Sequence, residues 1–299
     1  MATSTQKLEL KNNLSGESSV SDYFSLFKPR VMSLAVFTSI CGLYLAPGYL
    51  HPFLCVTAIL CISLGAGASG AINMWYDRDI DKLMDRTKDR PIPQGKILPS
   101  DALTFGVITS ILSIMILGLS VNWIAASLLG FTIIFYAIVY TIWLKRYTVQ
   151  NIVIGGAAGA FPPVIGQVCA SGTIGFESLI LFLIIFVWTP PHFWALALIK
   201  KDDYAAAKIP MLPIIAGEKV TRKNIFIYSL LLVPCSYLPW IFDFSGNFYL
   251  IITTIFGIEF LRRSFLILKE VEGSEKNLFL YSIFYLSIIF AGICFDKII

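Results

Sequence analysis

Hydrophobic residues occupy long runs along this chain, and short polar loops separate the runs. Crossing a bilayer as a helix takes about 20 mostly apolar residues. Nine segments approach or exceed that length: residues 28–47, 53–76, 102–119, 122–143, 150–170, 177–199, 224–243, 247–268 and 278–296. Lipid cannot satisfy exposed backbone N–H and C=O groups, so each segment should be helical. The pattern predicts an all-α fold: a polytopic membrane protein with nine transmembrane helices around a central cavity.

The composition supports the same class of protein. Of the 299 residues, 57% are hydrophobic and only 14% are charged, whereas a soluble domain carries about 25% charged residues. The net charge of +4 comes without a long basic run or an RNA-binding motif, which argues against nucleic acid as a partner. Residues 1–21 are polar. We expect them to form a disordered cytoplasmic tail, followed by a single transmembrane domain over residues 22–299.

Basic residues are distributed unevenly between the predicted loops. With nine helices, 22 of the 23 lysine and arginine residues fall on one side of the membrane, and only Lys297 falls on the other. Cytoplasmic loops carry the excess of Lys and Arg, so the N-terminus and the acidic loops should be cytoplasmic. The first 20 residues contain no arginine and lack the features of a transit peptide. A multi-pass protein in the lipid of a bacterial inner membrane is therefore expected.

An acidic motif lies at the predicted cytoplasmic end of segment 53–76. Asn73, Asp77, Asp81 and Asp85 recur every four residues, so a continuous helix would place them on one face. Such like charges repel, and the C-terminal end of a helix disfavours anions, so a cation must offset them. An oxygen-only set of ligands suits Mg²⁺. Asn73, Asp77 and Asp81 are therefore candidate catalytic and metal-binding residues. The alternative is a solvated loop whose acidic and basic residues simply pair.

A second polar loop follows segment 177–199. It contains Asp202 and Asp203, which are candidate ligands of a second metal ion, although such a run is also typical of an exposed turn. Basic residues near both loops are candidates for direct contacts to phosphate oxygens: Arg30, Arg86, Arg90, Lys145 and Arg146. Each of them is equally compatible with a role as a topology anchor.

His192 is an ionisable residue inside segment 177–199, about seven residues or roughly 10 Å below its cytoplasmic end. An ionisable residue at membrane depth is a functional candidate by default, and the alternative is a satisfied packing residue. The stretch from Gly155 to Pro163 is rich in small residues. It predicts close helix packing followed by a break at Pro162-Pro163.

These motifs resemble a known family. Asn-x-x-x-Asp-x-x-x-Asp, followed by Arg-Thr-x-x-Arg-Pro at residues 86–91, resembles the UbiA superfamily of intramembrane prenyltransferases, whose members have nine transmembrane helices. Residues 28–31, 73–81, 151–163, 189–197, 202–204 and 209–213 favour its heme-modifying branch. The likeness runs from about residue 22 to the last helix. Met74, Ile199 and His192 depart from the pattern of the members that use aromatic substrates.

The resemblance implies an enzyme that transfers a farnesyl group from farnesyl diphosphate to a vinyl group of heme B, with addition of water, to form heme O. It implies a Mg²⁺ cofactor held by the first motif with Asp202 or Asp203. Arg86, Lys145 and Arg146 would neutralise the pyrophosphate, and His192 would orient the porphyrin or ligate its iron. A partner enzyme that receives heme O fits this role. The alternatives are an aromatic-acid polyprenyltransferase of quinone biosynthesis and, in a different class, a cation channel or transporter.

Overall fold

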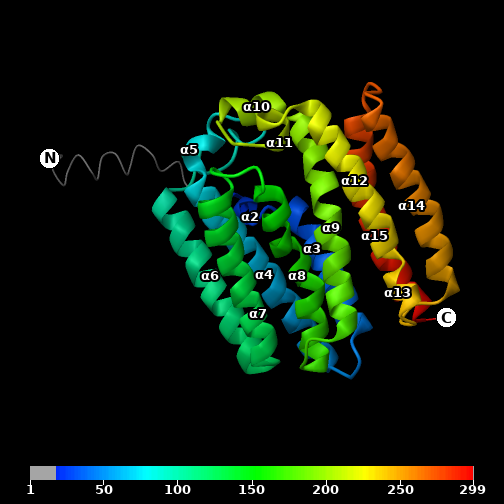
Figure 1. The fold of residues 1–299 in the computed structure, drawn as a ribbon. Helices are drawn as coiled ribbons and strands as arrows, with labels where there is room; N and C mark the ends of the chain where they lie inside the picture. Colours follow the sequence, from blue (N-terminus) through cyan, green and yellow to red (C-terminus); the bar gives the residue numbers. More distant parts are fainter. Residues whose placement is uncertain (1–17, 299) are drawn as a thin grey trace, which may run out of the picture.

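A bundle of long helices forms this protein, shown in Figure 1. The structure is a computed structural model that describes residues 18–298, and most of the predicted tail lies outside that range. The long helices are α3 (Pro29–Leu45), α4 (Pro52–Tyr76), α6 (Pro99–Ser120), α7 (Trp123–Ile134) with its continuation η1 (Phe135–Leu144), α8 (Asn151–Ser171), α9 (Phe176–Ile199), α12 (Glu218–Ser236), α14 (Asn247–Leu268) and α15 (Ser274–Asp296). The short helices are α2 (Val20–Leu26), α5 (Arg78–Asp81), α10 (Lys201–Ala206), α11 (Leu212–Ile215) and α13 (Leu238–Ile241). The all-α prediction is confirmed.

Fewer helices than predicted have the length and composition of membrane spans. Within residues 18–298, seven helices are long and apolar enough to cross a membrane, or eight if the bent pair α2 and α3 counts as one span. The remaining predicted segment, 247–268, is the 22-residue helix α14, which carries Glu259, Arg262 and Arg263 in its last three turns. Because of these three charges, α14 is not apolar enough to count as a membrane span. The predicted count of nine spans is therefore not confirmed.

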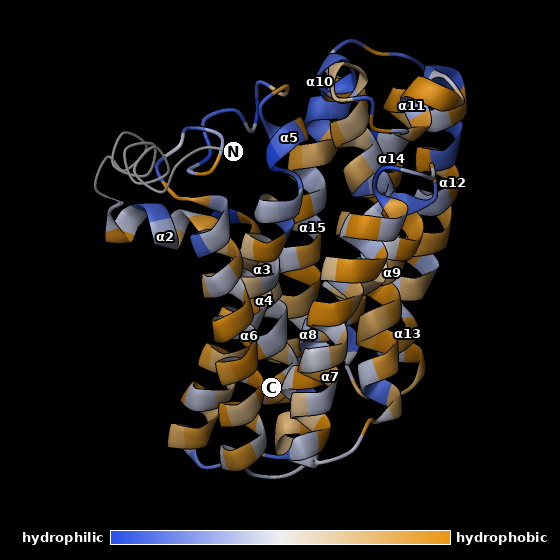
Figure 2. Ribbon diagram, turned by 90° about the vertical axis from the view of Figure 1, so that its left-hand side faces the viewer, coloured by the Kyte–Doolittle hydropathy of each residue, from blue (hydrophilic) through white to orange (hydrophobic). Residues whose placement is uncertain are grey.

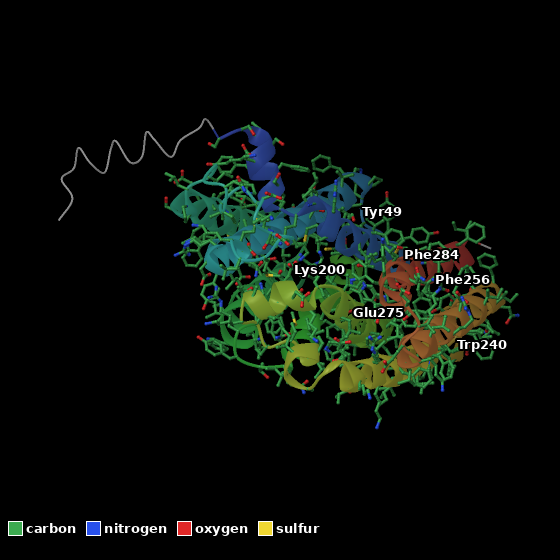
Figure 3. The ribbon with its side chains drawn as sticks, turned by 90° about the horizontal axis from the view of Figure 1, so that it is seen from above. Tyr49, Lys200, Trp240, Phe256, Glu275 and Phe284 are labelled. Atoms are coloured by element: carbon green, nitrogen blue, oxygen red, sulfur yellow. The ribbon has the colours of Figure 1, made fainter. Side chains whose placement is uncertain are left out.

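Polar residues gather at one end of the bundle (Figure 2). The short helices α5 and α10 are the helical parts of the two predicted acidic loops, and both lie at this end. Seen from above, Lys200 lies over the middle of the bundle (Figure 3). The loop after α5 is fixed in place because Ile92 and Ile97 are buried with Leu26, Ala71 and Met74. The fold therefore brings together two loops that lie more than 100 residues apart in the sequence.

Glycine permits a very close crossing of α3 and α8. A Cβ atom on Gly166 would lie 2.1 Å from the Ser39 carbonyl oxygen, and one on Gly42 would lie 2.0 Å from that of Pro163. The close packing predicted for the small-residue stretch is confirmed at Gly155 and Gly156, where a Cβ atom would meet neighbouring side chains, but not at Gly159, where no described atom lies within 4 Å. The predicted break at Pro162-Pro163 is wrong, since α8 continues to Ser171. Proline removes intrahelical hydrogen bonds, but neighbouring helices make such sites tolerable in transmembrane helices.

Candidate active site

The acidic motif forms a buried row at the end of α4. Asn73, Asp77 and Asp81 are 3%, 0% and 1% exposed, and Asn73 Nδ2 donates to Asp77 Oδ2 at 2.9 Å. The row extends over only three of the four residues. Asp85 lies in the exposed turn beyond α5 and pairs with Lys88 at 2.6 Å. The predicted common face therefore ends at Asp81, where α5 itself ends.

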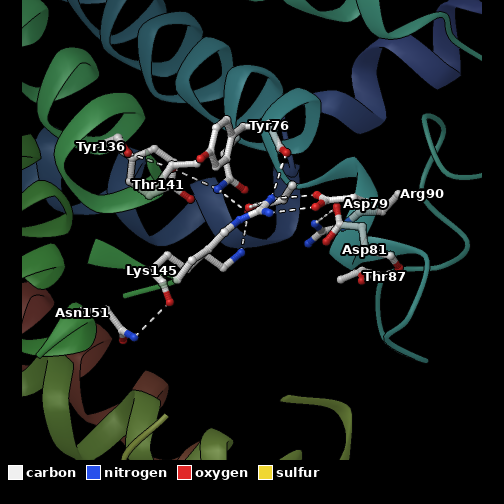
Figure 4. Close-up of polar contacts among 12 residues, drawn as sticks. Tyr76, Asp79, Asp81, Thr87, Arg90, Tyr136, Thr141, Lys145 and Asn151 are labelled. Carbon is white, nitrogen blue, oxygen red and sulfur yellow. Dashed lines mark hydrogen bonds and ion pairs between the residues drawn. The ribbon is translucent and has the colours of Figure 1, made fainter. Parts of the chain in front are cut away.

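Basic side chains oppose the two buried carboxylates. Lys145 Nζ donates to Asp77 Oδ2, and Arg146 Nη2 lies 3.4 Å from Asp77 Oδ1. Arg90 Nη1 donates to Asp81 Oδ2 at 2.7 Å (Figure 4). The sequence predicted these three cations as contacts to phosphate oxygens; the structure places them against the acidic motif, and contact with a phosphate stays a prediction. A buried carboxylate needs such partners because desolvation makes an unpaired charge very unfavourable.

Arg146 also binds the exposed edge of the motif. Its two Nη atoms each lie 2.7 Å from an oxygen of Asp79, and its guanidinium lies over the Tyr76 ring, 4.7 Å from the ring centroid. The hydrogen bonds from Arg146 lower the pKa of Asp79 below its ordinary value. This bidentate pair orients the guanidinium beside Asp77.

A π-helix positions Lys145. In η1 the backbone bonds span five residues, as where Lys145 N donates to Tyr140 O at 2.8 Å. The side-chain hydroxyl of Thr141 donates to Tyr136 O at 2.8 Å. Thr141 Oγ1 also accepts from Asn73 Nδ2 at 3.0 Å (Figure 4). Such π segments are rare and are frequent at functional sites. The sequence analysis missed Thr141, since hydropathy does not distinguish a π-helix from an α-helix.

Lys28 is a fourth cation at the site. Its Nζ donates to Asn73 Oδ1 at 2.6 Å. Lys28 adopts a left-handed φ of 51° at the junction where α2 and α3 meet at 59°, a conformation that is uncommon for a residue other than glycine. Gly67 makes room for the junction, because a Cβ there would lie 2.7 Å from the Phe27 ring. From the sequence, Lys28 was only one of the basic residues of the cytoplasmic side and part of a family motif.

The second loop contributes Asp203 and Tyr204 on α10. Asp203 Oδ2 is buried and has no hydrogen-bond partner among the described residues; the Lys200 Nζ atom lies 3.9 Å away. Tyr204 is buried, and burial raises the pKa of its hydroxyl while the nearby charges of Arg86 and Arg90 lower it. Tyr204 also belongs to the same buried hydrophobic cluster as Ile80 and Met84, which links the second loop to the first.

The other predicted site residues lie at the rim of the polar end. Asp202, Arg86 and Arg30 are all exposed. Arg86 lies near Tyr204, as its effect on that hydroxyl indicates. Arg30 is in the first turn of α3, where its carbonyl accepts a hydrogen bond from Ser33. Roles for these three residues in binding stay predictions.

The donor set is suited to Mg²⁺ in one specific way. Within residues 18–298, no three carboxylate, histidine or cysteine side chains form a ready cluster for a metal ion. Asn73, Asp77 and Asp81 supply only oxygen ligands, and Asp203 adds a buried oxygen that lacks a partner. Mg²⁺ is usually held by one or two carboxylates together with waters and substrate phosphates. The residues therefore fit a metal ion that a phosphate substrate helps to bind.

His192 is buried within α9 in an aromatic sandwich. Its ring stacks on Trp188 at 4.3 Å and on Phe279 at 4.8 Å between centroids. Its Nδ1 lies 2.7 Å from Ser282 Oγ, and Ser282 donates its own hydrogen to the Phe279 carbonyl at 2.7 Å. Ser282 must therefore accept from His192 Nδ1–H, which leaves the lone pair of the neutral ring on Nε2. The sequence analysis missed Ser282, which is one of many serines in apolar helices.

Comparisons with known proteins identify the family. Residues 35–289 match the model of the UbiA prenyltransferase family. A protein of Rhizobium leguminosarum bv. trifolii (strain WSM2304) named protoheme IX farnesyltransferase is 54% identical over 287 residues, which cover 94% of this chain and 91% of the relative. A protein of the same name from Brucella ovis is 53% identical over 287 residues, covering 94% of this chain and 92% of the relative.

Solved structures share the fold. One from work on digeranylgeranylglyceryl phosphate synthase matches with a TM-score of 0.77 at 22% identity, covering 93% of this chain and 98% of its own. A UbiA homologue from Archaeoglobus fulgidus bound to DMAPP and Mg²⁺ matches with a TM-score of 0.71 at 16% identity, covering 91% of this chain and 99% of its own. Fold and sequence agree: the chain is a prenyltransferase and belongs to the UbiA prenyltransferase family.

Proposed function

We propose that this prenyltransferase transfers the farnesyl group of farnesyl diphosphate to a vinyl group of heme B, in a Mg²⁺-dependent reaction that adds water and forms heme O. The observation that carries the proposal is the buried row of Asn73, Asp77 and Asp81, opposed by cations at the polar end of an apolar bundle. The choice of heme as acceptor rests on the two relatives named protoheme IX farnesyltransferase at 54% and 53% identity.

The charge balance of the site favours a diphosphate. Four cations contact the motif, namely Lys28, Arg90, Lys145 and Arg146, against three carboxylates, namely Asp77, Asp79 and Asp81. One positive charge is left, and a bound Mg²⁺ would add two. A highly charged anion is therefore the complementary ligand, and arginine and lysine are the side chains that best recognise its phosphate oxygens.

Each buried carboxylate would exchange partners when substrate binds. Asn73, Asp77 and Asp81 would hold Mg²⁺ with the diphosphate, with Asp203 or Asp202 contributing from the second loop. The phosphate oxygens would lie beside the carboxylates that hold the same metal ion. The side chains of Lys145, Arg146 and Arg90 would then exchange the carboxylates for the phosphate oxygens as hydrogen-bond acceptors. When bound, the metal ion withdraws electron density from the leaving group and so stabilises its developing charge. A UbiA homologue of the same fold was solved with DMAPP and Mg²⁺ bound, which supports a metal-dependent reaction of a prenyl diphosphate.

The reaction balances as a transfer of one carbon group. The bond between farnesyl C1 and oxygen breaks, and its electron pair leaves with pyrophosphate, which Lys145, Arg146 and Arg86 would neutralise. A bond forms between farnesyl C1 and the terminal carbon of the heme vinyl group. Water adds to the resulting cation as a hydroxyl group and releases one proton. The protein contributes binding, orientation and fixed positive charge to these steps.

His192 would contact the porphyrin through Nε2. The His192 ring stacks on Trp188 and Phe279, and its Nδ1 is used by Ser282. Nε2 is therefore the atom left for a ligand, and neutral imidazole is a common axial ligand of iron.

We place the protein in a bacterial inner membrane with its polar end towards the cytoplasm, where Arg30 at the rim would meet the incoming diphosphate. A partner enzyme would receive the product.

Product mass spectrometry tests this proposal. Purified protein in lipid is given farnesyl diphosphate and Mg²⁺ with heme B in one sample and 4-hydroxybenzoate in another, each with an EDTA control. The proposal predicts a heme product heavier by one farnesyl group plus one water, and only without EDTA. Prenylated 4-hydroxybenzoate without a heme product would keep the metal site and replace the acceptor. A heme product formed equally in EDTA would contradict the role of the metal.

A further inference from the structure

The turn between α14 and α15 borders a half-open cavity of about 220 Å³ at the polar end of the bundle. It shares no residue with the active site described above. Its wall carries charges of both signs, Arg262 and Arg263 against Glu272, together with the polar side chains of Ser274 and Asn277. A cavity with both charges calls for a ligand that also has both.

The two arginines keep donors free for an anion. Arg262 uses Nε and Nη2 to bind Glu259, at 2.6 and 2.7 Å. Arg263 uses Nε to bind Glu259 at 2.6 Å and Nη1 to bind the carbonyl of Asn277 at 3.5 Å. A guanidinium has five N–H donors, so three remain on each arginine. One carboxylate shared by two guanidinium groups leaves one positive charge, which suits a phosphate.

Ser274 provides an independent indication of a ligand. Its side chain is 4% exposed and lines the cavity, yet its Oγ has no hydrogen-bond partner in the part of the chain that the structure describes. Buried polar groups are normally paired, and an unpaired one needs an explanation. Ser274 is also the first residue of the 23-residue helix α15, and free N–H groups at a helix N-terminus attract phosphate.

An apolar stripe leads along α14 to the cavity. Ile251, Ile255 and Ile258 are 57%, 58% and 62% exposed, and their spacing places them on one helix face. Arg262 continues that face, and its side chain is 58% exposed. At the outer edge of the same helix pair, Phe256 and Phe284 pack at 5.5 Å (Figure 3). A ligand with hydrocarbon chains along this stripe would place its polar head at Arg262.

We propose that this cavity binds the headgroup of a zwitterionic aminophospholipid. Arg262, Arg263 and the Ser274 hydroxyl bind its phosphate, and Glu272 binds its primary ammonium. Residues 259–277 contain four basic and four acidic residues, so the region has no net charge to attract an anionic lipid. The primary ammonium can donate hydrogen bonds to Glu272, which a quaternary choline group cannot do. The geometry thus favours phosphatidylethanolamine over both phosphatidylglycerol and phosphatidylcholine.

Native mass spectrometry of the delipidated full-length protein tests the site. The protein is titrated with each of the three phospholipids, and we expect phosphatidylethanolamine to bind about tenfold more tightly than the others, a difference of about 1.4 kcal/mol. The double variant Arg262→Gln/Arg263→Gln should lose about tenfold in affinity for phosphatidylethanolamine. Glu272→Gln, which changes no backbone contact, should remove the preference over phosphatidylcholine. Glu270→Gln, on the same turn but outside the cavity wall, is the matched control and should bind like the wild type.

Three results would overturn the proposal. Equal binding of the three lipids by the wild type would show that the cavity does not select a headgroup. An unchanged preference in Glu272→Gln would remove the ammonium contact. Binding of soluble phosphoethanolamine as tight as that of the lipid would assign the cavity to a soluble phosphate ester instead.

Discussion

Asp77→Asn separates the electrostatic role of the acidic motif in folding from its role in catalysis. Asp77 is fully buried, and the side chains of its partners Lys145 and Arg146 are 12% and 24% exposed. Removing one partner of a buried ion pair costs about 3–5 kcal/mol, because it leaves an uncompensated charge. Since both cations keep some contact with water, we expect a loss at the lower end, about 3 kcal/mol. Loss of the carboxylate should also lower kcat by about 100- to 1,000-fold, the effect of removing one electrostatic contact at a reacting centre.

A second substitution distinguishes the two effects. In Asp77→Asn/Lys145→Met the uncompensated ammonium is gone, while Arg146 keeps its bidentate pair with Asp79. We expect this double variant to regain at least half of the lost stability but none of the activity. Stability is measured as the free energy of unfolding by SDS in mixed micelles, and activity as initial rate of product formation. Recovery of the rate together with the stability would contradict a catalytic role of the Asp77 carboxylate, and so would a wild-type rate in Asp77→Asn.

Three further predictions concern residues that only the structure identified. Lys28→Met should raise KM for farnesyl diphosphate about tenfold, because it removes the charge-assisted hydrogen bond from Lys28 to Asn73. The control Lys82→Met, at an exposed site of the adjacent loop, should leave KM unchanged. An unchanged KM in Lys28→Met would contradict its role. Ser282→Ala should weaken heme binding by about 10- to 100-fold, as expected when a group that orients a metal ligand is lost. Binding is measured from the absorption of heme. Ser282→Thr should preserve binding, and an equal loss in both variants would mean that Ser282 acts through packing alone. Gly166→Ala should lower the free energy of unfolding by about 1–3 kcal/mol through overpacking, since its Cβ would meet the Ser39 carbonyl at 2.1 Å. The control is Gly159→Ala in the same helix, where no described atom lies within 4 Å of the added Cβ. This control should not destabilise the protein.

The sequence predicted the helices and the acidic motif well, because both depend on local patterns. Long apolar runs specify helices in lipid irrespective of their neighbours, and every predicted segment overlaps a helix of the structure. The four-residue spacing correctly grouped Asn73, Asp77 and Asp81, since all three lie on one short, nearly continuous helical stretch. The inclusion of Asp85 in this group was wrong, because α5 ends at Asp81. Charge spacing alone does not predict where a helix ends.

Other features depend on tertiary contacts and carry no local signal. Lys28 reaches Asn73 only because the chain bends by 59° on a surface opened by Gly67. Thr141 faces Asn73 because η1 is a π-helix, whose hydropathy matches that of an α-helix. Pro162 and Pro163 predicted a break that packing against α3 overrides. Ser282 fixes the orientation of His192 across 90 residues of sequence, a distance that no spacing rule covers.

The proposed mechanism requires that a metal ion at the acidic motif touches the diphosphate. Mn²⁺ replaces Mg²⁺ in the purified protein together with a thiolo analogue of farnesyl diphosphate that does not react, and the coupling between the metal and ³¹P is measured by electron–nuclear double resonance. We expect a clear ³¹P coupling in the wild type that disappears in Asp77→Asn/Asp81→Asn. A coupling of unchanged strength in that variant would place the metal elsewhere and contradict a metal site at Asp77 and Asp81.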